Sequence, residues 1–427
     1  MEIFKNKLLM SSSVYVIANL FSAVVPFILL PYLTNNVDTK GYGTIALISI
    51  AVNFVGPFVG LCVDGALLRR FYNGNEFKYD LYLSNCLYIV LSSYFILSIL
   101  SYFFGEHIGQ LFLIPSYTIK YIFFISFSNI INQFTLTTWR VNEKPVYYGL
   151  FQIILSLTNL CFTFYFISGL HHSWEGRMEA WALANGVFSV FSITFLFKKK
   201  LIFKSITSKY IKDALKFSIP LIPHAIGAML LGFFSRLIVG NVLNIEQVGI
   251  FSVSYQFASI LGITFAAFNT AFVPWLFGKL KSNNPDHVLL VRSSYKLILI
   301  FIVVTLISCL AIYTLFPFMV SENYFESKIY IFYLLIAFMF NGMYYLFANY
   351  IFYKEKTKYL GYSTGIISIA HLPICYFLTQ KYGLTGAAVS NIISYFFLLT
   401  ITALISFKVY PMPWASEIKN TFNFKAK

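Results

Sequence analysis

Long apolar segments separated by short polar gaps follow one another along the whole chain. Each apolar segment is close to the ~20 residues that a helix needs to cross about 30 Å of hydrocarbon. Strands of a membrane barrel would be half as long and would alternate apolar with polar residues, so helices are expected. The predicted spans are 8–32, 42–66, 81–104, 119–138, 147–168, 179–197, 213–239, 248–277, 295–318, 329–352, 359–379 and 385–407.

Composition supports the same fold class. The 427 residues are 58% hydrophobic and only 11% charged, with a mean hydropathy of +0.73. Such a chain has too little polar surface to cover a soluble globule. The sequence therefore predicts an all-α, multi-pass membrane protein with twelve transmembrane helices.

The basic residues are distributed unevenly between the two sides of the predicted bundle. With the N-terminus inside, most of them lie in cytoplasmic gaps, including the run Lys198–Lys200. The outer gaps hold only Lys40, Lys120, Arg177, Lys328 and Lys381. Because basic residues near span ends are retained in the cytoplasm, both termini are predicted to be cytoplasmic. The net charge of +15 then reflects topology and contact with membrane lipids, and no nucleic-acid partner is expected.

The cysteine and histidine residues do not form a recognisable site. All five cysteines fall inside predicted spans, and none are spaced as a ligand pair. His171 and His172 are adjacent in an outer gap, but no Cys, Asp or Glu stands at metal-ligand spacing beside them. A nucleotide-binding Walker sequence is also missing. We therefore expect no cofactor and no metal.

Two short polar gaps resemble each other. "NEKPVYYG" (142–149) and "KEKTKYLG" (354–361) share Glu-Lys-x-x-Tyr-x-Gly, and both lie in predicted cytoplasmic gaps. Shifting the chain by 206 residues also aligns Asn35 with Asn241 and Asn185 with Asn391. These matches predict two six-helix bundles around a central cavity, formed by lobes 1–204 and 205–427. The alternative is that short helix hairpins simply favour this turn sequence.

Three motifs resemble those of a known family. They are "LPYLTNNVDTKGYG" (30–43), "IPLIPHAIG" (219–227) and "SRLIVGNVLNIEQVGIFSVSYQF" (235–257). They are similar to the polysaccharide flippases, the O-antigen branch of the multidrug/oligosaccharidyl-lipid/polysaccharide exporter superfamily. The resemblance implies transport of a polyprenyl-diphosphate-linked oligosaccharide from the inner to the outer leaflet of a bacterial inner membrane. Many relatives carry a basic residue after "PYLT", where this chain has Asn35.

Two ionisable residues inside predicted spans are candidate transport residues. Arg236 lies well within span 213–239, and an intramembrane arginine usually faces a wet cavity or a partner. Its planar fork suits a phosphate, although it could instead extend toward the outer headgroups near 241–244. Asp64 lies at the inner end of span 42–66. It is either a coupling-ion or proton site, or the partner of Arg69 and Arg70.

Five further basic residues lie at the cytoplasmic ends of spans. They are Arg69, Arg70, Arg140, Arg292 and Lys296, and the last two share a helix face at i, i+4. A basic inner vestibule could capture a diphosphate. Each residue taken alone is better explained as a topology signal.

Two other function classes compete with this interpretation. A polysaccharide polymerase or ligase needs an acid, base or nucleophile on an outer loop, and every predicted outer loop is short, so no enzyme activity is expected. A drug exporter of the same superfamily is the nearer alternative, but cationic drugs favour carboxylates, whereas Arg236 favours an anion. A lipid-linked oligosaccharide is thus the expected cargo, with other polysaccharide-assembly proteins as further candidate partners.

Overall fold

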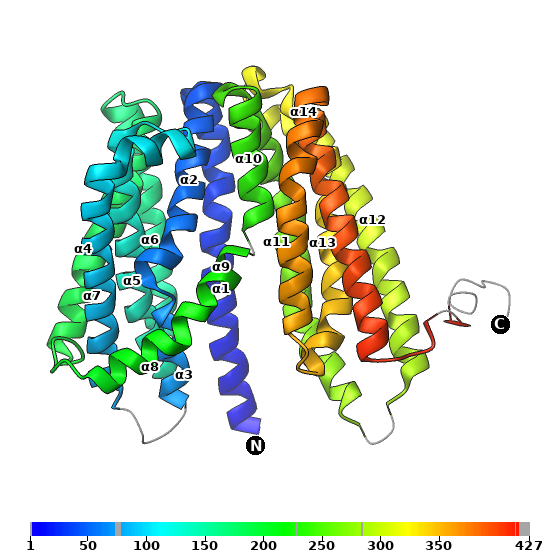
Figure 1. The fold of residues 1–427 in the computed structure, drawn as a ribbon, viewed down its shortest axis with the longest axis horizontal. Coiled ribbons are helices and arrows are strands. Elements are labelled where there is room, and N and C mark those ends of the chain that lie inside the picture. Colours follow the sequence, from blue (N-terminus) through cyan, green and yellow to red (C-terminus); the bar gives the residue numbers. More distant parts are fainter. Residues whose placement is uncertain (1, 73–77, 228, 283–284, 415, 418–427) are drawn as a thin grey trace. The chain divides into compact units, whose positions relative to one another are not determined.

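The computed structural model describes residues 2–72, 78–227, 229–282, 285–414 and 416–417. The chain divides into two compact units, unit 1 (Met1–Met229) and unit 2 (Leu230–Lys427). The elements of unit 1 are α1 (Glu2–Asn36), α2 (Thr39–Gly60), α3 (Val63–Tyr72), α4 (Tyr79–Phe112), η1 (Ser116–Thr118), α5 (Ile119–Val141), α6 (Pro145–Phe164), η2 (Tyr165–Gly169), α7 (Trp174–Lys198), α8 (Ser208–Ser218), η3 (Ile219–Leu221) and α9 (Ile222–Gly227) (Figure 1). The elements of unit 2 are α10 (Leu230–Val242), α11 (Ile245–Leu280), α12 (His287–Met319), η4 (Glu322–Tyr324), α13 (Ser327–Tyr353) and α14 (Lys358–Val409).

The predicted all-α membrane class is confirmed. Among the described residues, nine helices are long and apolar enough to cross a membrane, or ten if Ser208–Gly227 and Leu230–Val242 form one broken span. α14 is interrupted at Gly383, whose φ of 60° and ψ of −141° are not helical. This break falls between the predicted spans 359–379 and 385–407. The count of twelve spans, the two bundles and the side of the termini remain predictions.

α5 is the most polar of the long helices in unit 1 and also one of the most buried. It packs against α2, α4 and α7, and most of its residues are buried by these neighbours. Ser192 of α7 donates a hydrogen bond to the amide oxygen of Asn132 at 3.0 Å, and the Asn132 amide group donates to the backbone of Asn185 at 3.4 Å. Polar residues are therefore compatible with this helix because protein groups, rather than lipid, surround them.

The second predicted span, 42–66, is not continuous. Leu61 and Cys62 have left-handed backbones, with φ of 47° and 52°, and they separate α2 from α3. Side chains with a Cβ are disfavoured in this region, so two in succession end a helix sharply. The predicted continuous helix over 42–66 was wrong at this point, because Leu61 and Cys62 are apolar like the rest of the span and hydropathy does not reveal the break. Asp64 consequently belongs to the first turn of the short helix α3.

The predicted span 213–239 is also broken. α8, η3, α9 and α10 replace one continuous helix, in a segment that contains Pro220 and Pro223. α8 is amphipathic: Lys209, Lys212 and Lys216 are exposed, whereas the opposite side of the helix is buried. It lies obliquely across α3 and α4 in Figure 1 and packs on both. This pattern is typical of a helix at a membrane surface.

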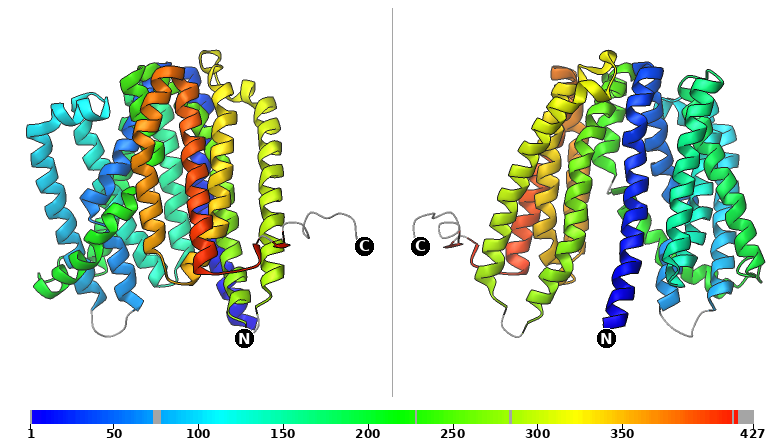
Figure 2. Two further views of the ribbon diagram at one scale, coloured as in Figure 1. Left: turned by 45° about the vertical axis from the view of Figure 1, so that its right-hand side comes forward. Right: turned by 180° about the vertical axis from the view of Figure 1, so that it is seen from behind.

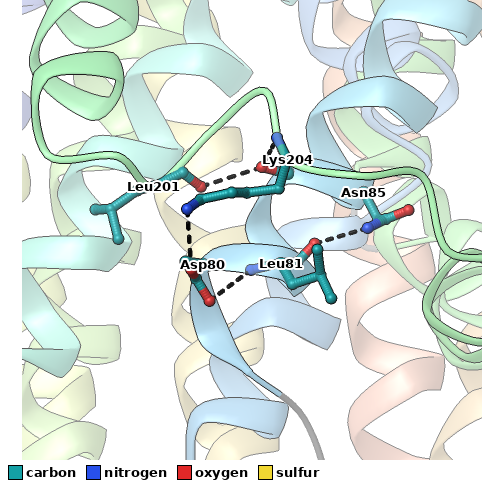
Figure 3. Close-up of polar contacts among 6 residues, drawn as sticks. Asp80, Leu81, Asn85, Leu201 and Lys204 are labelled. Atoms are coloured by element: carbon teal, nitrogen blue, oxygen red, sulfur yellow. Dashed lines mark hydrogen bonds and ion pairs between the residues drawn. The ribbon is translucent and has the colours of Figure 1, made fainter.

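The basic segment before α8 is fixed to α4 by hydrogen bonds (Figure 3). The Asn85 amide group donates to the backbone oxygen of Ser205 at 3.2 Å and its oxygen accepts the Thr207 N–H at 2.8 Å. Lys204 donates its backbone N–H to the Ser84 hydroxyl at 3.0 Å, and its ammonium lies 3.5 Å from the Asp80 carboxylate. The segment is therefore an ordered part of unit 1.

In unit 2, α13 is the central helix and packs against α11, α12 and α14, which run alongside one another in Figure 2. The rings of Phe265 and Phe301 stack at 4.1 Å between centroids. Gly342 allows α13 to approach this stack, because a Cβ at that position would lie 2.3 Å from the Phe265 ring. Close packing of this kind replaces the hydrophobic effect as the force that joins helices in lipid.

Candidate functional site

Arg236 is held on three sides within unit 2. Its Nε donates to the Ser252 hydroxyl of α11 at 3.1 Å, and its Nη1 donates to the backbone oxygen of Gly232 at 3.2 Å. The guanidinium carbon lies 4.1 Å from the centre of the Tyr255 ring, which is the geometry of a cation–π contact. These neighbours fix the plane of the guanidinium.

The direction of the side chain argues against extension to the outer headgroups. Arg236 reaches back toward Gly232, one turn earlier in α10, whereas Asn241 lies in the last turn of that helix and Asn244 lies just beyond its end. An arginine that reached for the polar turn would point toward those asparagines instead. The partly buried guanidinium therefore lies beside Gly232, in the first turn of α10.

A fully buried polar network lies directly beside Arg236. The Ser235 hydroxyl and Nε2 of His371 are 2.9 Å apart, and Nδ1 of His371 is 2.8 Å from the Ser394 hydroxyl. The Asn391 amide group also donates to the Ser235 hydroxyl, at 2.9 Å. His371 precedes the break at Gly383 and Asn391 follows it, so the network joins α10 to both parts of α14.

His371 was not among the site residues expected from the sequence. Its signal was available, because it is the one histidine within the predicted span 359–379. An ionisable residue within a predicted span is a candidate functional residue, as Arg236 is.

Arg70 has a carboxylate partner that the sequence analysis did not foresee. Its Nε donates to Asp213 at 2.8 Å and its Nη2 donates to the second oxygen of the same carboxylate. The Tyr82 hydroxyl donates to Asp213 at 2.9 Å. The hydrogen bond with Asp213 raises the pKa of Arg70 above its ordinary value, so the guanidinium stays charged. The group joins α3 and α4 to α8.

The expected alternative in which Asp64 is the partner of Arg70 is thus corrected in favour of Asp213. Asp64 is exposed in the first turn of α3. Arg69 is also exposed, and its guanidinium carbon lies 4.6 Å from the centre of the Phe217 ring. The helix break at Leu61 and Cys62 turns this segment toward α8, which explains the unforeseen partner.

The remaining basic residues are dispersed. Arg140 donates to the Tyr148 hydroxyl at 3.1 Å in unit 1, where α5 meets α6. In unit 2, Arg292 donates to Glu417 at 2.7 Å, which ties α12 to the C-terminal segment, and Lys296 is exposed one turn later. Within each unit these side chains have separate neighbours. A common basic vestibule remains a hypothesis.

Arg177 was assigned from the sequence to an outer gap before span 179–197; in the structure it lies in the first turn of α7, which begins at Trp174, and its side chain contacts α6. Its Nη1 donates to the Asn159 amide oxygen and, at 3.1 Å, to the Thr163 hydroxyl, both on α6. The sequence also indicates that Arg177 lies on a different face of the helix from its neighbouring glutamates. Glu175 and Glu179 stand two residues on either side, and residues at that spacing point away from each other on a helix.

None of the described residues form a group of three or more His, Cys, Asp or Glu side chains suited to a metal ion. The arrangement in unit 2 is therefore best described as a cation held among hydroxyl, carbonyl and aromatic groups. Chemically, such a group can bind an anion, and a planar guanidinium favours a phosphate or carboxylate.

Comparison with known proteins assigns the chain to a family. The sequence pattern of the family described as polysaccharide biosynthesis protein matches residues 8–280. The chain belongs to this polysaccharide biosynthesis protein family. The resemblance to a polysaccharide-biosynthesis family that was drawn from its short motifs is confirmed.

Relatives of this polysaccharide biosynthesis protein include two from Haemophilus influenzae. A protein of the Lsg locus is 25% identical over 421 residues, which cover 89% of this chain and 99% of the relative. An uncharacterised membrane protein is 24% identical over 372 residues, which cover 86% of this chain and 89% of the relative.

Solved structures show the fold of this family member. The lipid II flippase MurJ in an inward closed conformation has a TM-score of 0.72 at 15% identity, covering 95% of this chain and 89% of MurJ. The MATE transporter VcmN of Vibrio cholerae has a TM-score of 0.62 at 14% identity, covering 98% and 99%. The protein therefore has the multi-pass fold that MurJ and the MATE transporters share.

Proposed function

We propose that this protein is a flippase that moves a polyprenyl-diphosphate-linked oligosaccharide from the cytoplasmic to the outer leaflet of a bacterial inner membrane. Membership in the polysaccharide biosynthesis family supports a carbohydrate cargo. The fold shared with MurJ supports a lipid-linked one. In this proposal two six-helix bundles, 1–204 and 205–427, alternate access to a central cavity, with both termini in the cytoplasm.

The observation that carries the proposal is Arg236 inside α10. An arginine within a span is unfavourable unless it serves a ligand or a partner. Ser252, Gly232 and Tyr255 hold the guanidinium plane in place, so its orientation is set before a ligand arrives. A preorganised cation of this kind suits one phosphate of a diphosphate headgroup.

A drug exporter is the second candidate, and the fold shared with the MATE transporters favours it. A site for cationic drugs would need carboxylates at the position of the cargo. The ionisable side chain that α10 places within the span is an arginine, which repels a cation. An anionic cargo is therefore the better match.

The test is transport in liposomes of a fluorescent lipid-linked oligosaccharide. Arg236→Ala is expected to abolish flipping, and Arg236→Lys to restore it only in part, because an ammonium lacks the fork. Lys381→Ala, which removes an exposed charge in the same unit, is the matched control and should transport normally. Normal flipping by Arg236→Ala at normal expression would reject the phosphate-binding role, and efflux of a cationic dye without flipping would favour the drug exporter.

A further inference from the structure

Arg177 is partly buried near the start of α7 in unit 1. A single nitrogen, Nη1, makes both of its hydrogen bonds, to Asn159 and Thr163. The guanidinium also lies 5.9 Å from the centre of the Trp181 ring. In the part of the chain that the structure describes, Nε and Nη2 have no hydrogen-bond partner. These two nitrogens form the edge of a guanidinium that binds two oxygens of one anion.

The charge of Arg177 is also not matched by a carboxylate. The two glutamates of α7 nearest to it along the chain have partners elsewhere. Glu175 accepts a hydrogen bond from Tyr117 at 3.4 Å, and Glu179 lies 2.7 Å from Nδ1 of His172. Both partners of the Arg177 guanidinium on α6 are neutral. Within the described ranges Arg177 forms no ion pair, and an unpaired cation at a partly desolvated position attracts an anion.

α6 carries a continuous row of polar side chains toward this position. We call the row the α6 seam; its members are Tyr148, Gln152, Ser156, Asn159 and Thr163. They recur at intervals of three or four residues and so share one helix face, about 22 Å long at 1.5 Å per residue.

Protein groups line the α6 seam along its length. Ser22 of α1 donates to Gln152 at 3.1 Å and accepts from Ser156 at 3.0 Å. Arg140 bonds to Tyr148 at one end, and Arg177 bonds to Asn159 and Thr163 at the other. The seam therefore has an arginine at each end.

The backbone beyond the seam is also irregular. η2, which begins two residues after Thr163, is a π-helix, and its widened turn closes with the Leu170 N–H on the Tyr165 carbonyl at 3.0 Å. π-helical turns are rare and occur frequently at functional sites. Here the wide turn follows the last turn of α6, which contains Thr163, one of the two residues that hold Arg177.

We propose that Arg177, Asn159 and Thr163 form a phosphate-binding site in unit 1, at the end of the α6 seam remote from Arg140. Nε and Nη2 bind two phosphate oxygens, while Asn159 and Thr163 fix the guanidinium through Nη1. The inference rests on the proposed function only for the origin of the phosphate, which would belong to the cargo headgroup. The binding itself does not depend on transport.

The test is equilibrium binding to the full-length protein in a phosphate-free detergent. Three probes separate the sources of phosphate: farnesyl diphosphate, phosphatidylglycerol and inorganic pyrophosphate. All variants are made on an Arg236→Ala background, so that the site proposed in unit 2 does not contribute. Lys120→Gln, which removes an exposed charge from α5 in the same unit, is the matched control.

Arg177→Gln is expected to weaken binding of at least one probe by roughly tenfold or more, as for loss of hydrogen bonds to a charged group. The affinity of Arg177→Lys should fall between those of Arg177→Gln and the Arg236→Ala parent. The affinity of Lys120→Gln should stay within about twofold of that parent. Selective loss of farnesyl diphosphate would assign the site to a lipid diphosphate, and selective loss of phosphatidylglycerol to a membrane lipid.

Equal affinity of Arg177→Gln and its parent for all three probes would overturn the proposal, and a lower melting temperature alone would then identify Arg177 as a packing residue. If Arg177→Gln does not fold, equal affinities of Arg177→Lys and its parent overturn it in the same way. The outcome is independent of the proposed function, because transport by the Arg236 variants is measured separately.

Discussion

Glu143 and Glu355 have the same left-handed backbone conformation, with φ of 52° and 56°. The lysine after each glutamate donates its N–H to the carbonyl five residues earlier, at 2.9 Å from Lys144 to Trp139 and at 3.1 Å from Lys356 to Ile351. Non-glycine residues rarely adopt this conformation, and the bond satisfies a carbonyl left open at the helix end. The two similar sequence stretches therefore form the same turn.

The N-termini of α2 and α11 are capped in the same way, although their sequences differ. Asp38 accepts the Gly41 N–H at 2.9 Å and Asn244 accepts the Gln247 N–H at 2.8 Å, and the two caps are related by the 206-residue shift. A local preference for one turn sequence does not explain this second match. We therefore favour a duplicated architecture over the local explanation.

The shared turn predicts that both glutamates respond alike to glycine. Glu143→Gly and Glu355→Gly should each leave stability unchanged or raise it by up to about 1 kcal/mol, because glycine has no Cβ to clash at positive φ. Glu246→Gly, in the right-handed first turn of α11, should lower stability by about 1 kcal/mol. Thermal unfolding in detergent measures all three, and opposite responses of Glu143 and Glu355 would contradict the shared turn.

The carboxylate of Asp213 is predicted to hold α8 in place. Asp213→Ala removes the partner of Arg70 and Tyr82 and should lower stability by about 2 kcal/mol. Asp80→Ala is the control: its carboxylate is 40% exposed and 3.5 Å from Lys204, so about 1 kcal/mol or less is expected. Hydrogen exchange of 208–218 should accelerate in Asp213→Ala only. Equal exchange in both variants would count against the role of this group.

The ring of Tyr255 is predicted to matter more than its hydroxyl. Tyr255→Phe keeps the face beneath Arg236 and should transport within about twofold of the wild type. Tyr255→Leu loses the cation–π contact, worth about 1–2 kcal/mol, and should slow flipping roughly tenfold. The liposome assay distinguishes the two. Similar rates for Phe and Leu would show that the ring does not position the guanidinium.

The topology prediction can be checked across one helix. α7 separates His171 from Lys198, so single cysteines at these positions should be labelled from opposite sides of the membrane. Lys198 is expected to be cytoplasmic because basic residues cluster after it. Impermeant maleimide applied to intact cells is the measurement, and labelling of both positions from one side would contradict the predicted orientation.

The membrane potential is predicted to contribute to transport. Each negative charge of a diphosphate gains roughly 2.3 kcal/mol per 100 mV on leaving an inside-negative compartment. Flipping should therefore accelerate under an imposed potassium-diffusion potential, and a rate indifferent to voltage in the wild type would reject this.

Asp64 is predicted to modulate the cycle by taking up an incoming proton or sodium ion. At clamped voltage, the wild type should respond to a pH or sodium gradient and Asp64→Asn should respond less. Asp64 is exposed at the start of α3, where an ion can reach it. An unchanged gradient response in Asp64→Asn would remove this residue from the mechanism.

The sequence by itself determined the membrane class, most of the helices and the turns at Glu143 and Glu355. These properties are local: hydropathy adds along a segment, and a helix end depends on the few residues that close it. The family resemblance was also within reach, because its motifs are contiguous stretches.

Only the tertiary structure decided which side chains meet. Arg70 binds Asp213, 143 positions away, because left-handed residues at 61 and 62 turn α3 toward α8. Arg177 faces Asn159 and Thr163, although its position in the sequence resembles an outer loop. A side chain's partner depends on helix phase and on the helices packed beside it, and neither follows from hydropathy.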